Sequence, residues 1–82
     1  MSDEELVEAW IEQDAFKRPI ADARLKDFGV AVWAIVADLK LGRKPEEIAE
    51  DYGLDLDAVC AAIAYYQKHP DEIDARVAMN AA

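Results

Sequence analysis

The segment PEEIAEDYGLDLDAVCAAIAYY, residues 45–66, has the pattern of two helices joined by a tight turn. Pro45 suits the first position of a short helix, because its ring fixes φ and its missing N–H is not needed there. Gly53 follows that helix, at the position where a left-handed backbone favours glycine. Asp55 can then cap a second helix. The apolar residues of the second helix recur at helical spacing: Leu56, Val59, Cys60, Ile63 and Tyr66. The segment therefore predicts a helix-turn-helix, with an ordinary helical hairpin as the alternative.

The flanking sequence predicts three further helices and an extended arm. Ser2 and Glu5 have the spacing of a capping box before a helix of about residues 3–13. Residues 16–29 alternate between apolar and charged side chains, which is the period of a half-buried strand. A helical period returns at Val32 and ends near Gly42, and Pro70 begins a last helix.

The predicted fold is mainly α, with a homeodomain-like helix-turn-helix core, an N-terminal helix and a short extended β arm. We expect a single domain over residues 1–82. Residues 1–29 form the N-terminal helix and arm, residues 30–69 form the three-helix core, and residues 70–82 form the C-terminal helix.

A single arm with strand period leaves its backbone amides and carbonyls without partners. Pairing with residues 28–32 of the same chain is one solution, but the connection is short. We therefore expect the arm to pair with its copy across a two-fold axis, which makes the protein a homodimer. The length of 82 residues also favours self-association, because a chain of this size buries only roughly 60% of its unfolded surface.

The charge of the segment argues against DNA binding by the second helix. Residues 45–66 contain six carboxylates and no Lys or Arg, and the whole chain has a net charge of −9. Its second helix is expected to expose only acidic or small residues, without a base-reading side chain before Gln67: Asp55, Asp57, Ala58, Ala61, Ala62 and Ala64. If DNA is bound at all, the phosphate contacts are expected from Arg24, Lys26, Arg43 and Lys44.

The sequence contains few of the Ser, Thr, Cys and His residues that commonly act in nucleophilic catalysis. Ser2 is the only Ser or Thr, and Cys60 and His69 are the only residues of their types. Cys60 lies on the apolar stripe of its helix and is expected to be buried. The acidic residues of the short helix are explained by the helix dipole rather than by a bound cation. We expect no enzymatic activity, no cofactor and no metal site.

Several segments resemble the bacterial family known as domain of unknown function 433: RLKDFGVAVWAIV at 24–36, PEEIAEDYGL at 45–54, Val59, Ala62, AYY at 64–66, His69-Pro70 and IDAR at 73–76. The resemblance implies a helix-turn-helix core behind an N-terminal arm and kinship with VapB-like antitoxins. Such antitoxins are commonly associated with PIN-like ribonuclease toxins. Common members carry Gly-Thr-Arg between arm and core, whereas this chain has Asp27-Phe28-Gly29 and so lacks the basic side chain.

The resemblance and the charge together predict an antitoxin-like, non-catalytic interaction protein. Its expected partner has a basic surface, and a cognate PIN-like toxin is the candidate. The partner-binding residues are predicted to be Trp10, Leu25 of the arm, and Arg76 on a mobile C-terminal helix. The alternatives are a dimeric transcriptional regulator that binds operator DNA and a structural domain without a known role. No apolar run approaches the ~20 residues of a membrane span, so we expect a cytoplasmic protein without membrane contact.

Overall fold

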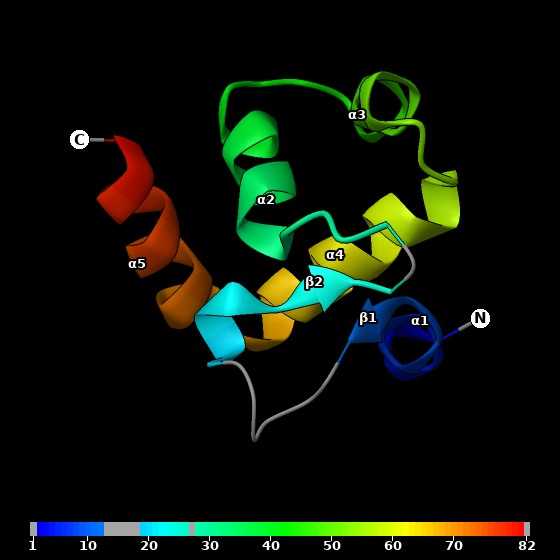
Figure 1. Cartoon of the computed structure of the whole chain (residues 1–82), viewed down its shortest axis with the longest axis horizontal. Coiled ribbons are helices and arrows are strands. Elements are labelled where there is room, and N and C mark those ends of the chain that lie inside the picture. The colour runs from blue at the N-terminus through cyan, green and yellow to red at the C-terminus, as the bar shows by residue number, and fades with distance from the viewer. Residues whose placement is uncertain (1, 13–18, 27, 82) are drawn as a thin grey trace.

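Helices make up most of the part of the chain that the computed structural model describes, which is residues 2–12, 19–26 and 28–81. Within these ranges the order of elements is α1 (Asp3–Trp10), β1 (Ile11–Glu12), the 3-10 helix η1 (Ile20–Asp22), β2 (Arg24–Leu25), α2 (Val32–Lys40), α3 (Pro45–Tyr52), α4 (Leu56–Lys68) and α5 (Pro70–Ala81). Figure 1 shows α4 at the centre, with α1, α2, α3 and α5 around it. The prediction of a mainly α fold is confirmed.

The ends of α3 lie where the sequence places them. Pro45 is the first helical residue, and the backbone N–H of Lys44 donates to Glu47 Oε1 at 2.9 Å. Gly53 has a φ of 68°, in the left-handed region, and the N–H of Leu54 donates to the carbonyl of Ala49 at 2.8 Å. This hydrogen bond closes the end of α3 and directs the chain into α4.

Helix α1 is capped at both ends by side chains. At its start, Ser2 Oγ accepts from the N–H of Glu5 at 3.2 Å and donates to the Glu5 carboxylate at 3.2 Å. At its end, Lys26 Nζ donates to the carbonyl of Glu8 at 2.7 Å, and the Lys26 N–H donates to the carbonyl of Trp10 at 2.7 Å. Lys26 thus provides the cation that the last turn of α1 lacks in its own sequence.

The arm pairs within its own chain, contrary to the predicted pairing with a second copy. Strand β2 is antiparallel to β1, with Ile11 opposite Leu25, and Arg24 also forms a bridge with Ala31. Gly29, with a φ of 70°, lets the chain reverse after β2, so that Leu25 N–H donates to the carbonyl of Val30 at 2.8 Å. Arm pairing therefore gives no reason for a dimer.

The predicted boundaries of the first 29 residues also change. Helix α1 ends at Trp10 rather than near residue 13, because Ile11 and Glu12 are extended and pair with β2. Among the described residues of the predicted strand over residues 16–29, Arg24 and Leu25 are paired as β2, while Ile20–Asp22 form a 3-10 turn. Residues 13–18 and 27 of these predictions lie outside the described part of the chain.

The core is built around α4. Helix α1 makes its most extensive contact with α4, while α2 contacts α4 and α5, and α3 packs on α4. Figure 1 shows α1 nearly end-on while α4 runs across the view, so the two helices cross steeply. The largest fully buried side chains come from β1, β2, α2, α3, α4 and α5: Ile11, Leu25, Val32, Ile35, Val36, Ile48, Val59 and Ile73.

Candidate protein interaction surface

The alanines of α4 that were predicted to be exposed are buried. Ala58, Ala61 and Ala62 have no exposed surface, and Ala64 is 3% exposed, so their predicted exposure is wrong. Helical spacing puts Ala61 and Ala64 in line with Lys68, whose Nζ lies 4.0 Å from Glu4 Oε1 of α1. The side of α4 that carries Ala61 and Ala64 therefore faces α1, which leaves no free surface there for the groove of a nucleic acid.

The exposed part of α4 is its first turn and the last turn near Gln67. Asp55, Leu56 and Asp57 are exposed at the start, and Leu56 retains 43% of its surface, although the apolar stripe predicted that it is buried. Leu56 precedes the part of α4 that its neighbours cover.

Cys60 is half-buried, and burial, followed by the charges of Asp57 and Glu46, raises the pKa of its thiol. This environment keeps the sulfur protonated and does not make it a nucleophile.

Three of the four residues that were predicted to bind phosphate make contacts within the chain instead. Arg43 pairs with Asp51, and its second nitrogen lies 3.5 Å from Asp38. The hydrogen bond with Asp51 is the main reason why the pKa of Arg43 is raised. Arg24 donates to the carbonyl of Gly29 at 2.9 Å, and Lys26 caps α1.

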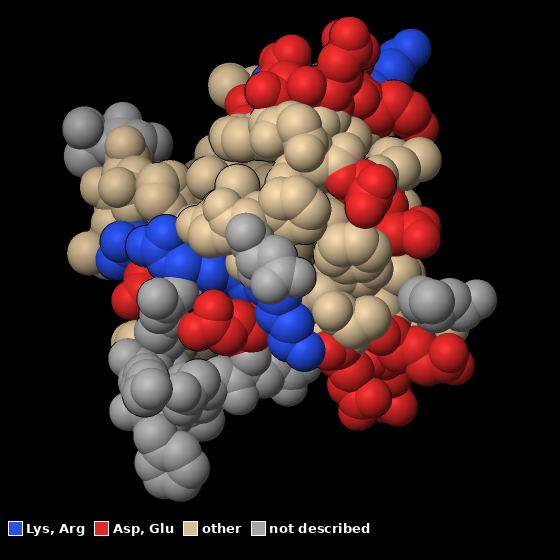
Figure 2. Space-filling model, turned by 45° about the vertical axis from the view of Figure 1, so that its right-hand side comes forward, with Lys and Arg blue, Asp and Glu red and all other residues tan. Residues whose placement is uncertain are grey.

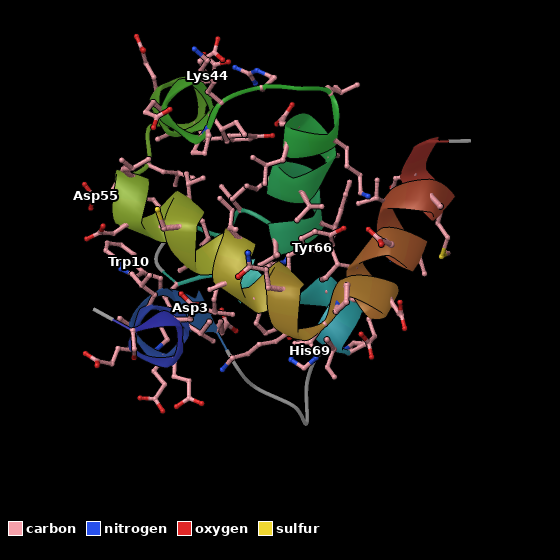
Figure 3. All side chains as sticks on the ribbon, turned by 180° about the vertical axis from the view of Figure 1, so that it is seen from behind. Asp3, Trp10, Lys44, Asp55, Tyr66 and His69 are labelled. Atoms are coloured by element: carbon pink, nitrogen blue, oxygen red, sulfur yellow. The ribbon has the colours of Figure 1, made fainter. Side chains whose placement is uncertain are left out.

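Lys44, the fourth predicted phosphate ligand, is exposed at the start of α3, where Figure 3 labels it. Glu46 and Glu47 follow it directly and are exposed as well. The structure therefore brings no group of free cations together at the α3–turn–α4 unit among the described residues.

Acidic side chains gather on one face of the molecule. Figure 2 shows them along its upper, right-hand and lower right-hand edges, where α3, the start of α4 and α1 lie, with an area of uncharged residues between. All of the acidic residues of these three elements are exposed: Asp3, Glu4, Glu5, Glu8, Glu46, Glu47, Glu50, Asp51, Asp55 and Asp57. The face is therefore strongly negative and unsuited to a polyanion.

Two of the predicted partner-binding residues differ sharply in accessibility. Trp10 is half-buried, and its ring stacks on Phe28 with a centroid distance of 6.2 Å and an interplanar angle of 22°. Phe28 retains 40% of its surface. Leu25, in contrast, is fully buried, because β2 turns this side chain into the core. Leu25 thus cannot contact a partner in this fold, whereas the Trp10–Phe28 pair can.

The structure contradicts the predicted freedom of Arg76. One guanidinium nitrogen lies 3.3 Å from Asp22 Oδ1, and the guanidinium stands 5.6 Å from the centre of the Trp33 ring. Its Nε is buried without a hydrogen-bond partner among the described residues. Arg76 therefore links α5 to η1 and α2 within the chain.

A polar cluster that the sequence patterns did not indicate links α2, α4 and α5. Asp74 Oδ1 accepts from Tyr66 Oη at 2.7 Å and lies 2.9 Å from Lys40 Nζ, which also stands 5.6 Å from the Tyr66 ring centre. The hydrogen bond from Lys40 is the main cause that lowers the pKa of Asp74, and its counterpart raises the pKa of Lys40. Lys40 and Asp74 are thus paired with each other, and the cluster helps to hold the three helices together.

Among the described residues, no group of three or more His, Cys, Asp and Glu side chains is placed to hold a metal ion. In the same part of the chain, every helix is too short or too polar to span a bilayer.

Comparison with known proteins assigns the chain to a family. Neither the curated proteins nor the solved structures include a match to it. A family model described as protein of unknown function (DUF433) matches residues 21–66. This range contains β2, α2, α3 and most of α4, and it leaves α1 and α5 outside. Because the match covers more than half of its length, and includes the residues that carried the resemblance at 24–36 and 45–54, the chain belongs to the DUF433 family.

Proposed function

We propose that the protein is a non-catalytic, antitoxin-like interaction protein that binds and neutralises a PIN-like ribonuclease toxin. The kinship with VapB-like antitoxins that the sequence resemblance implies supports the class of partner. The observation that carries the proposal is the placement of charge: the exposed acidic residues of α1, α3 and the start of α4 form a negative face, while the middle of α4 is buried by the helices around it.

A negative face of this kind favours association with a basic protein surface. Complementary charge raises the rate of encounter and excludes partners of the same sign. A nuclease must attract RNA, so the rim of its substrate site is basic. Carboxylates of α1 and α3 can occupy that rim in place of RNA phosphates, which would block the substrate.

The rival function is a dimeric regulator that binds operator DNA. The tight turn at Gly53 and the exposed Lys44 favour it. The burial of Ala61 and Ala64, and the internal pairing of Arg43, count against it. It requires a dimer of about 18 kDa, twice the chain mass of 9.1 kDa, which light scattering measures. A mobility shift with operator-region DNA at low salt tests the binding itself.

Co-expression with the product of the adjacent gene tests the antitoxin proposal. We expect the two proteins to co-purify, the complex to weaken as salt rises, and the nuclease to lose activity in the complex. The nuclease alone and this protein alone serve as controls for activity and for adsorption to the resin. A neighbour that does not co-purify, or a complex with full nuclease activity, would contradict the proposal.

A further inference from the structure

We propose that the protein docks a basic amphipathic helix of its partner on one defined surface, here named the aromatic-acidic face. Its apolar centre is formed by Trp10 at the end of α1, Phe28 after β2 and Leu56 in the first turn of α4, and Asp55 and Asp57 flank Leu56 in the sequence. The proposal rests on the proposed function, because it names the segment through which a protein partner is recognised.

The apolar centre of the aromatic-acidic face consists of side chains that the fold leaves partly uncovered. Trp10 and Phe28 stack on each other, and Phe28 and Leu56 retain 40% and 43% of their surface. Figures 1 and 3 both place the end of α1 and the start of α4 on the same side of the molecule, and Figure 3 labels Trp10 near Asp55. Large apolar groups exposed together, with a polar rim, are typical of an interface.

The rim of this face determines the chemistry of the occupant. The carboxylates of α3 lie above the apolar area of Figure 2, those of α1 lie below it, and acidic side chains also line its right-hand edge, where α4 begins. An apolar strip between two acidic borders matches a helix whose apolar stripe is flanked by Lys or Arg on both sides. A second copy of this chain would place carboxylates against carboxylates, and a nucleic acid would place phosphates there.

A synthetic peptide provides the probe. We choose a helical peptide of Leu and Lys with Leu at every third or fourth position, and two controls: the same residues in scrambled order, and the same helix with Glu in place of Lys. In a titration followed by NMR of the isotopically labelled protein, we expect the shifts to centre on the Trp10 indole, Phe28 and Leu56. The scrambled and acidic peptides should leave these signals unchanged.

Matched variants separate the apolar centre from its rim. Leu56→Ser should weaken peptide binding about tenfold, as truncation of an interface anchor does, whereas the equally conservative change Met79→Ser on exposed α5 should have no effect. The double variant Asp55→Asn and Asp57→Asn should weaken binding and flatten its salt dependence. Asp71→Asn with Glu72→Gln removes the same charge at the start of α5 and serves as its control. Asn is also a good N-cap, so α4 should remain intact, which circular dichroism checks.

The outcomes distinguish this inference from the proposed function. Shifts at another surface, no binding of the Leu-Lys peptide, or equal effects of Leu56→Ser and Met79→Ser would overturn it. So would self-association that Leu56→Ser abolishes, because the face would then be occupied by a second copy. A neighbour protein that co-purifies equally well with Leu56→Ser would overturn the docking surface and leave the proposed function intact. Peptide binding at the face without any co-purifying neighbour would contradict the function alone.

Discussion

At the scale of single residues, Arg76 shows how one side chain ties three elements together. It reaches from α5 to Asp22 of η1 and to the ring of Trp33 on α2. The Arg76→Ala variant should therefore lose about 1 kcal/mol of unfolding free energy, the sum expected of a partly exposed ion pair and a cation–π contact. Chemical denaturation measures this loss. Lys68→Ala, which removes only the 4.0 Å pair with Glu4, should change stability little. Equal stability of Arg76→Ala and the wild type would show that α5 is not held by this contact.

A charged side chain introduced at Ala61 tests whether α1 covers this side of α4. The Ala61→Lys variant would place an unpaired ammonium group in a fully buried position, which should destabilise the protein by about 3 kcal/mol or more. Gln67→Lys adds the same charge to the same helix at an exposed position and should cost little. Thermal unfolding of both variants measures the difference. An Ala61→Lys protein as stable as Gln67→Lys would mean that this face of α4 is open to solvent.

At the scale of elements, Asp74 joins α2, α4 and α5 and makes their packing sensitive to acid. Its pKa in the folded protein lies below the ordinary value of 3.8, so its contribution to stability is present above that pH and is lost as pH falls through the lowered pKa. Acid titrations of unfolding should therefore show a shallower loss of stability for Asp74→Asn than for the wild type. Asp71→Asn, on the exposed first turn of α5, should keep the wild-type slope. Identical slopes for the wild type and Asp74→Asn would contradict the role of the cluster.

The elements differ in how much of them the sequence predicts. Pro45, Gly53 and Pro70 act locally on the backbone, so the starts of α3 and α5 and the turn before α4 follow from the sequence alone. The arm was mispredicted because strand period does not reveal its partner, which is a two-residue strand at the end of α1. The alanines of α4 were misplaced for a similar reason. Alanine fits an exposed face or a close helix contact equally well, and only the packing of α1 decides between them.

The negative charge of the candidate surface could be predicted from the sequence, but the way its residues come together could not. The carboxylates of residues 45–66 are evident in the sequence, and the amphipathic ring of Trp10 led to the prediction that it is an interface residue, which stays a prediction. Its neighbour Phe28 comes from a distant segment, so their stacking emerges only when Lys26 and β2 bring the two together. The ion pair of Arg76 and the burial of Leu25 were not predicted, because these tertiary contacts cannot be read from local composition.

At the scale of the whole molecule, a net charge of −9 makes association depend on ionic strength. Binding to a basic protein should weaken as salt rises, chiefly through slower association, while the rate of dissociation changes less. Kinetic measurements on the co-purified complex at two salt concentrations test this expectation. Uncharged osmolyte at the same osmolality serves as the control. An association rate that does not depend on salt would mean that the acidic residues of α1 and α3 lie away from the interface.

The central claim is that the middle of α4 is buried: Ala61, Ala62 and Ala64 lie in the core, where they should be out of reach of a nucleic acid. Amide hydrogen exchange along α4, measured with and without excess duplex DNA at low salt, tests this claim most directly. We predict that Ala61, Ala62 and Ala64 exchange only through global unfolding, and that DNA leaves their rates unchanged, because these residues are buried in the free protein. Faster local exchange at these alanines that slows when DNA is added would contradict the account.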